Sequence, residues 1–258
     1  MGNTEVFVTA VYDDTTIVNT LGIAVELDRS ETVVFLNEES GKIEASQPVS
    51  MTVLADKSAY TSVPSIASLG RTYWSLPFHT DYSVTTRVMV FSTQVNTIVT
   101  NVLSGNVITI SDVGGSYETL WVYENESIVL ECSAPCLVFQ QIQHPNRVAD
   151  LFYANMYLPS KEQFTSSARL APGDLSMCEH KRIGLMTEQN ATGHVVVNGN
   201  SNNLTWAGNE MQYATLPLEN DDAVYLESSH GFLAALICET SDDRYPIVSA
   251  QVLDYMGE

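Results

Sequence analysis

The sequence predicts an all-β protein made of three tandem antiparallel β-sandwich-like modules that pack together and contain little helix. Short segments rich in Val and Thr either alternate apolar and polar residues or form apolar runs of strand length. Turn residues recur at intervals of about 8 to 12 residues, as in a sandwich. A set of short motifs also repeats with a period of roughly 80 to 97 residues, which suits one small sandwich per copy.

The first module is predicted to occupy residues 1–80. Its segment 23–28 (IAVELD) alternates apolar and polar residues, and 32–36 (TVVFL) is an apolar run of strand length. An acidic turn precedes a Thr-rich strand at 13–18 (DDTTIV), and a Val-Pro pair at 63–64 lies near the end of the module.

The second module is predicted at 81–175. The segment 96–99 (NTIV) repeats the Thr-rich strand of the first module, and 106–112 (NVITISD) alternates. Residues 146–157 have a hint of helical spacing after a proline, but their aromatic content fits a strand equally well. A Leu-Pro pair at 158–159 matches the Val-Pro pair of the first copy.

The third module is predicted at 176–258. Its strand candidates include 194–198 (HVVVN) and the apolar run 231–238 (GFLAALIC). No linker rich in Pro or Gly separates the copies. We therefore expect tight packing between them, and the chain is compatible with one integrated domain.

A recurring turn is the clearest sign of the repeat. In each copy a polar strand end that starts with a glutamate leads into a tight turn and then into a buried strand. Ser can bond a nearby backbone N–H, and Pro or Gly sets the turn dihedrals. The glutamates are Glu44, Glu131 and Glu227, and the repeat turns are at Pro48, Pro135 and Gly231. We expect these turns to superpose.

The charge balance excludes several classes of function. The 258 residues carry 31 Asp and Glu against 11 Lys and Arg, a net charge of −20, yet 45% of the residues are hydrophobic. So many apolar residues exclude a disordered acidic chain. The negative charge argues against nucleic-acid binding and against anionic membranes. No apolar run approaches the length of a membrane span, so no membrane insertion is expected.

Four cysteines are present, and their spacing does not match a zinc site. They are compatible with two disulfides or with four buried thiols, and disulfides are favoured. The expected pairs are Cys132 with Cys136, facing each other across a three-residue loop, and Cys178 with Cys238. The alternative is that one member of the first pair bridges to the third module.

Three Asn-x-Ser/Thr sequons occur, at Asn125, Asn190 and Asn203. A chain with this much Asn, Ser and Thr contains about that many by chance, so they are only glycosylation candidates. The N-terminal residues lack the basic start and apolar stretch of a signal peptide, although a start within a longer protein would give the same pattern.

Motifs that carry catalytic chemistry are missing, so the chain is predicted not to be an enzyme and to bind no cofactor. Asp222 and His230 could join a serine in a triad, but a sequence rich in Asp and Ser offers such triples by chance. Cys178 and His180 would share one face of a strand, without a third partner.

Acidic turns raise the question of calcium. The best candidates are Glu219, Asp221 and Asp222, since several carboxylates in one loop can converge on the ion. Asp and Asn favour turns on their own, so a solvated turn is the favoured interpretation.

The aromatic residues could supply a face that binds protein or glycan. Trp74 and Trp121 lie in apolar runs and are expected in the core, whereas the exposure of Trp206 is open.

The order of these motifs resembles the family of the IgG-Fc-binding protein N-terminal domain. That family's repeat has an acidic turn before a Thr-rich strand, a strand ending in Ser-x-x-Pro-Val, and then Leu-Pro before an aromatic residue or Leu-Gly and a Tyr strand. The first copy matches at 13–16 (DDTT), 46–49 (SQPV), 63–64 (VP), 69–70 (LG) and Tyr73. The second matches at 133–136 (SAPC) and 158–159 (LP), and the last at 197–199 (VNG), Trp206 and 229–234 (SHGFLA).

The copies depart from the pattern in two places: no glycine follows Phe164, and Gly231 replaces proline. The resemblance implies a non-catalytic binding or adhesion module of a secreted or cell-surface glycoprotein, with an extracellular protein or glycan partner. The alternatives are a secreted hydrolase on a β scaffold and a microbial or viral surface attachment protein. The acidic surface favours a basic or neutral partner.

Overall fold

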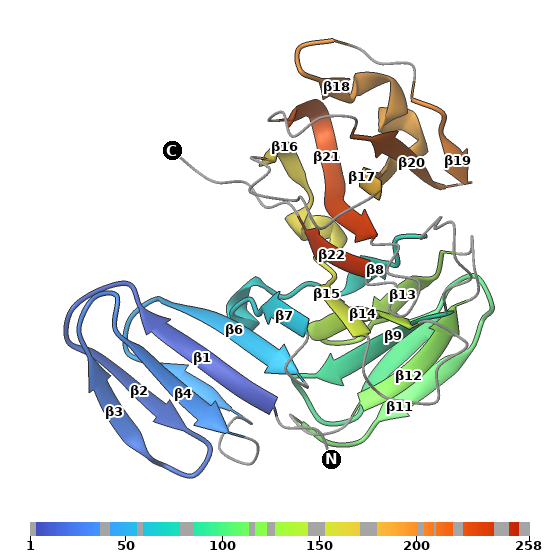
Figure 1. Cartoon of the computed structure of the whole chain (residues 1–258). Coiled ribbons are helices and arrows are strands. Elements are labelled where there is room, and N and C mark those ends of the chain that lie inside the picture. The colour runs from blue at the N-terminus through green and yellow to red at the C-terminus, as the bar shows by residue number, and fades with distance from the viewer. Residues whose placement is uncertain are drawn as a thin grey trace.

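The computed structural model is an all-β protein, as predicted (Figure 1). It describes residues 4–36, 42–55, 59–77, 85–113, 117–122, 127–143, 153–170, 180–200, 204–208, 210–218, 224–239 and 248–252. The only helices in these ranges are short 3-10 turns. None of the helices described is long and apolar enough to cross a membrane.

The first group of strands forms two sheets that enclose a common core, and we call it the first unit. One sheet contains β4 (Thr32–Leu36), β1 (Thr4–Ala10), β6 (Val49–Ala55) and β7 (Ala59–Ser62), in that order. The other contains β3 (Ala24–Leu27), β2 (Thr15–Asn19) and β5 (Ile43–Ala45). Because side chains alternate along a strand, Val6 and Val8 face inward and meet Ile17 and Leu27 of the second sheet.

The second group, our second unit, repeats this arrangement and adds one strand. One sheet has the order β12 (Tyr117–Val122), β9 (Thr85–Ser92), β14 (Cys136–Gln143), β15 (Tyr153–Tyr157). The other has the order β11 (Val107–Ile110), β10 (Thr97–Asn101), β13 (Val129–Cys132), β8 (Thr72–Trp74). Taken in chain order, β9 to β15 pair with one another in the same way as β1 to β7 do, and β8 is the additional strand.

The third unit joins the corresponding strands into one sheet. It contains β16 (Thr165–Leu170), β17 (His180–Glu188), β18 (Val196–Val197), β19 (Ala207–Gly208), β20 (Met211–Pro217), β21 (Val224–Glu239) and β22 (Val248–Val252). The long strand β21 takes the place of two strands in the other units. Its C-terminal half pairs with β17 and β22, as β6 pairs with β1 and β7. Its N-terminal half pairs with β18 and β16.

The repeat turns hold equivalent places in this register. Pro48 and Pro135 directly precede β6 and β14, whereas Gly231 lies inside β21, where the pairing with β16 shifts register. The residue after each of them pairs with a residue at or next to the C-terminal end of β1, β9 or β17. These pairs are Val49 with Ala10, Cys136 with Ser92 and Phe232 with Thr187. The third turn is therefore a bulge in a continuous strand.

A short connector links each unit to the next. The 3-10 turns η2 (Ile66–Ser68) and η3 (Lys161–Gln163) lead into β8 and β16. β8 pairs with β13 of the second unit, and β16 pairs with β21 of the third. Both strands precede the predicted boundaries at 80 and 175 and yet complete the sheet that follows those boundaries.

The second and third units share one hydrophobic cluster, the third unit has a second cluster of its own, and the first unit has a separate core. Met186, Leu233 and Ile237 of the third unit pack in the same hydrophobic cluster as Leu130 and Val138 of the second. A Cβ placed on Gly184 of β17 would lie 2.8 Å from Leu76 Cδ2, so the connector packs directly on this strand. At the centre of the molecule β15 lies against both β7 and β22 (Figure 1).

Candidate binding surface

One face of the second unit carries a row of apolar and aromatic side chains. In the sheet β12-β9-β14-β15, alternation turns Val88, Val90 and Val138 into the core. The side chains between them point to the opposite face and are partly exposed. We call this surface the aromatic face; its described members are Met89, Phe91, Leu137, Phe139 and Tyr157.

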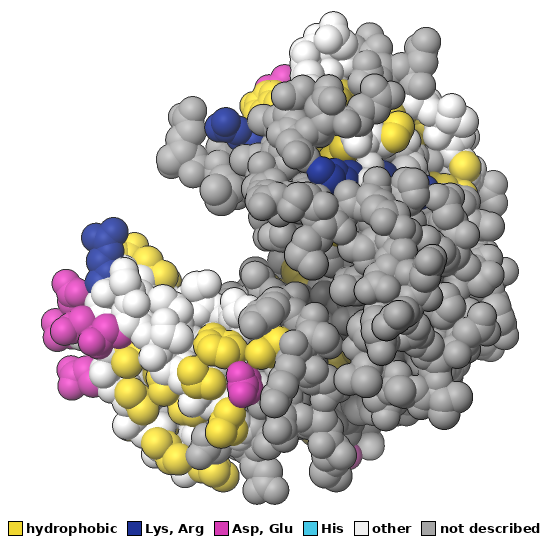
Figure 2. All heavy atoms as spheres, viewed as in Figure 1, with side chains coloured by type: hydrophobic (Ala, Val, Ile, Leu, Met, Phe, Trp, Pro, Cys, Tyr) yellow, Lys and Arg dark blue, Asp and Glu magenta, His cyan; other side chains and the backbone are white. Residues whose placement is uncertain are grey.

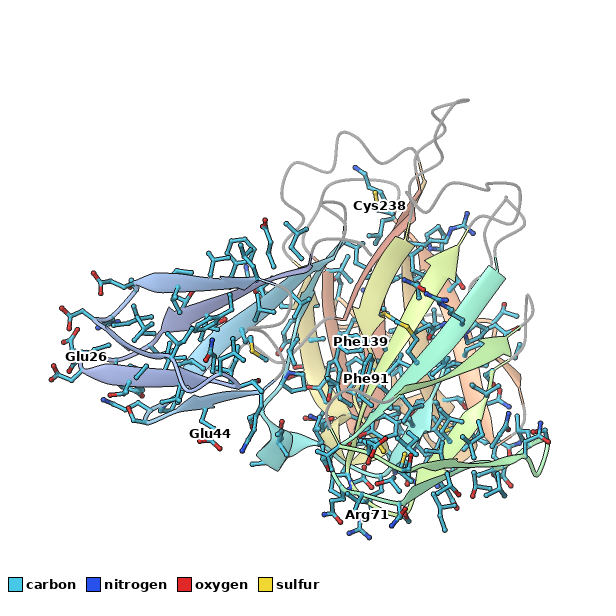
Figure 3. The ribbon with its side chains drawn as sticks, turned by 90° about the horizontal axis from the view of Figure 1, so that it is seen from below. Glu26, Glu44, Arg71, Phe91, Phe139 and Cys238 are labelled. Carbon is cyan, nitrogen blue, oxygen red and sulfur yellow. The ribbon has the colours of Figure 1, made fainter. Side chains whose placement is uncertain are left out.

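The aromatic rings contact each other across the strands. Phe91 and Phe139 stand edge to face, with ring centroids 5.9 Å apart, and Phe139 meets Tyr157 in the same way at 6.4 Å. Figure 3 shows Phe91 and Phe139 next to each other in this sheet. Such edge-to-face pairs hold the rings in place, so the face is largely preformed.

Polar groups border the aromatic face. The Arg87 Nε donates a hydrogen bond to Gln141 Oε1 on the neighbouring strand. The Tyr157 hydroxyl donates to Gln163 Oε1 at 2.6 Å, which ties β15 to η3. An apolar centre with a polar rim is the usual anatomy of a protein-binding patch.

The equivalent face of the third unit is already an interface within the chain. In the shared register Met186 corresponds to Phe91, Leu233 to Leu137 and Ala235 to Phe139. These three residues of the third unit are fully buried in the cluster that also contains Trp74 and Leu76. The same face of the sheet is therefore buried against another part of the chain in the third unit and is partly exposed in the second.

The first unit carries a smaller version of this face. Phe7 pairs with Val34, and Glu5 with Leu36, on the outer side of β1 and β4, and both aliphatic side chains are exposed. Figure 2 shows hydrophobic side chains on the near face of this unit and Asp and Glu side chains at its outer end. With Phe7 as the one partly exposed ring described in this row, it offers less aromatic surface than the second unit.

The predicted local disulfide between Cys132 and Cys136 is not formed in the structure, where both are buried free thiols. The prediction assumed two strands of one hairpin. Instead, Cys132 ends β13 and Cys136 begins β14, and these strands belong to opposite sheets. The hydrogen bond with Cys136 and burial together raise the pKa of the Cys132 thiol. Cys238 is disulfide-bonded, and its expected partner Cys178 lies outside the described residues.

Several other predicted site residues also lie outside the described residues. They are the calcium candidates Glu219, Asp221 and Asp222 and the sequons Asn125 and Asn203. Asn190 is exposed, in the 3-10 turn η4 (Gln189–His194). Within the part of the chain that the structure describes, no cluster of three or more His, Cys, Asp or Glu could hold a metal ion.

His230, a candidate catalytic histidine, lies on the surface of the third unit. His230 is exposed, with its Nδ1 3.1 Å from the Ser229 Oγ and its ring 4.8 Å from that of His194. Asp222, the third member of the triad, is outside the described residues. His180 begins β17, two residues after the undescribed Cys178.

The two tryptophans with described side chains, Trp74 and Trp206, do not belong to the aromatic face. Trp74 is buried, 6.0 Å from the Phe164 ring and below the ammonium of Lys161. Trp206 is partly exposed and packs on the core of the third unit, and Trp121 lies in β12 with its side chain undescribed. The sequence reasoning missed the Phe and Tyr residues of the aromatic face. Their signal was strands such as 136–139 (CLVF), which are apolar at consecutive positions and so have two apolar faces.

Comparison with known families gives one match. The model of the family described as IgGFc binding protein matches residues 52–238, well over half of the chain. Neither a curated protein nor a solved structure matches the chain.

Proposed function

The chain belongs to the IgGFc binding protein family, and from this premise we propose that it is a non-catalytic extracellular module that binds a protein partner through its aromatic face. The family is one of binding proteins, so binding is the activity to test first. Five partly exposed apolar side chains converge on one preformed sheet surface, and this observation supports the proposal most strongly.

Aromatic residues and Met are enriched in the centres of protein interfaces, and rigid aromatic rings bury a large area at low conformational cost. The equivalent face of the third unit already buries such a surface within the chain. A partner with a neutral or basic patch would suit the net charge of −20 better than an acidic one.

The test is a direct binding measurement with the purified chain on a sensor surface. The first probe is an immunoglobulin G Fc fragment, because the family's description names it, followed by panels of secreted proteins and of glycans. We expect saturable binding of a protein probe that Phe139→Ala weakens at least about tenfold, as loss of a central aromatic anchor does. Leu103→Ala is the matched control, since Leu103 is an exposed apolar residue of the second unit away from this face.

Two outcomes would contradict the proposal. Binding that survives Phe139→Ala unchanged would place the site elsewhere, and binding confined to the glycan panel would replace the protein partner with a carbohydrate. Circular dichroism of both variants confirms that any loss is local to the surface.

A further inference from the structure

The first unit has an open sheet edge where the other two units are complete. β8 covers the outer edge of β13, and β16 covers the corresponding N-terminal half of β21. β5 is the equivalent strand of the first unit, because Glu44 pairs with Val18 as Glu131 pairs with Thr100. Among the described residues, no strand pairs with the other edge of β5.

The backbone of β5 is arranged to accept a further strand. The Ser46 N–H donates to the Thr16 carbonyl oxygen, so in this antiparallel ladder the pair of Val18 and Glu44 is also hydrogen-bonded. The N–H and C=O groups of Ile43 and Ala45 therefore point away from β2. In the second unit the matching outward N–H, that of Cys132, donates to the Arg71 carbonyl oxygen at 2.8 Å.

Apolar side chains beside this edge are incompletely covered. We call them the acceptor strip: Ile43, Val49, Met51 and Val53, all partly exposed around the first core. The residues of the other units that correspond to Ile43 and Val49 are fully buried. In the second unit they are Leu130 and Cys136, with exposures of 1% and 0%, and in the third they are Leu226 and Phe232, with exposures of 0% and 1%. The repeat thus predicts a cover for the strip that the other two units already have.

The existing covers define the chemistry of the occupant. Each is an extended connector strand that buries an apolar side chain beside the edge it covers: Tyr73 in β8, which pairs with Leu130, and Ala168 in β16, which pairs with Leu226. An arginine accompanies each cover, Arg71 directly before β8 and Arg169 within β16. On the edge of β5, Glu44 lies at the surface of the first unit (Figure 3) and forms an ion pair with Lys42.

We propose that the outer edge of β5 and the acceptor strip form a docking site for the connector strand of another repeat unit of this fold. The strand would add antiparallel to β5, as β8 adds to β13, and would place an apolar side chain opposite Ile43. The proposal is independent of the proposed function, because it concerns a different unit and a sheet edge instead of a sheet face.

The test uses the whole chain and a fluorescent peptide with the sequence of residues 65–76, which contains β8. Fluorescence anisotropy should show saturable binding. Ala45→Pro removes the outward N–H without touching a bond to β2, and Pro is tolerated on an edge strand. We expect it to weaken peptide binding at least about tenfold and to leave the denaturation midpoint unchanged.

Ile43→Lys is a second variant that keeps every backbone donor and places a charge in the acceptor strip; it should also weaken peptide binding. A peptide with Tyr73→Asp should bind more weakly than the natural one. No saturable binding would overturn the proposal. Equal affinity of the peptide for the natural chain and for the Ala45→Pro variant would also overturn it, because the peptide would then be replacing β8 in the second unit instead of pairing with β5. Tighter binding of a β5 peptide than of the β8 peptide would overturn it too, since a second copy of β5 would then be the occupant.

Discussion

The hydroxyl of Tyr73 donates a hydrogen bond to the carbonyl oxygen of Cys136, which lies 63 residues further along the chain. The Gly70 carbonyl oxygen is a second acceptor, 2.8 Å from the same hydroxyl. Tyr73 belongs to β8 and Cys136 begins β14, so a side chain of the connector joins the two sheets of the second unit from inside its core.

Tyr73→Phe should therefore destabilise the protein. The change leaves the ring in place and removes only the donor, so the carbonyl oxygen of Cys136 loses a partner in a buried site. We expect the free energy of unfolding to fall by about 1–3 kcal/mol. Urea denaturation followed by circular dichroism measures it. Tyr12→Phe is the matched control, because Tyr12 is exposed, and it should change the midpoint little. Equal effects of the two variants would contradict the role of the Tyr73 hydroxyl.

Stability should decline in alkaline solution for a related reason. Burial raises the pKa of Tyr73 above its ordinary value of 10.0, and the Cys132 pKa is also raised from its ordinary 9.0. The unfolded chain loses these protons first, so the folded state binds more protons above pH about 9. The free energy of unfolding should therefore have its full value below pH about 9 and should fall as the pH rises above it.

Urea titrations at a series of pH values between about 7 and 11 measure this slope. The Tyr73→Phe variant should lose part of the decline above pH about 10, because its position 73 no longer titrates. A variant slope identical to that of the natural protein would show that Tyr73 does not contribute.

Gly70 fills a place that has no room for a side chain. A Cβ there would lie 2.5 Å from the Cβ of Ser160, a fully buried residue that precedes η3. Gly70→Ala should force the two connectors apart and destabilise the protein by about 1–3 kcal/mol, the usual cost of overpacking. Gly193→Ala is the control, because its Cβ would meet nothing within 4 Å. Thermal unfolding compares the two, and a midpoint shift as large for Gly193→Ala would refute the packing explanation.

The thiols can be counted chemically. Cys132 and Cys136 are free and buried, and Cys238 is disulfide-bonded. Alkylation of the denatured protein without reductant should therefore label Cys132 and Cys136 and leave Cys238 unlabelled, as peptide mass spectrometry can show. Prior reduction is the control and should make Cys238 reactive as well. Unlabelled Cys132 and Cys136 would mean that the pair oxidises in the isolated protein.

The fold class was predictable because it depends on local patterns. Alternation at 23–28 and the apolar run at 32–36 predict strands from side-chain periodicity alone, and β3 and β4 lie there. The hydrogen bonding of the recurring serines was also predictable. Ser46 accepts a hydrogen bond from the Thr16 N–H and Ser133 accepts one from the Ile98 N–H, both at 2.9 Å. Their partners were not, because the sequence pattern predicted a nearby N–H and the N–H groups that donate lie 30 and 35 residues earlier in the chain.

The pairing of distant strands was not predictable. Nothing in the sequence shows that β8 completes the sheet of the unit that follows it, or that Cys132 and Cys136 lie on opposite sheets. Both facts depend on backbone hydrogen bonds between segments far apart in the chain, and a backbone amide has the same chemistry at every position. The aromatic face was missed for the same reason: Phe91 and Phe139 come together only because β9 pairs with β14.

By itself, then, the sequence determined an acidic all-β protein with a repeated turn and a recognisable family pattern, because composition and periodicity are local properties. The tertiary structure alone decided which edges are closed and which faces stay open. Tyr73 closes the second unit, and Ile43 is left partly exposed in the first, although the two units share one strand order. The difference lies in whether a connector strand reaches the edge, and that is set by long-range strand pairing.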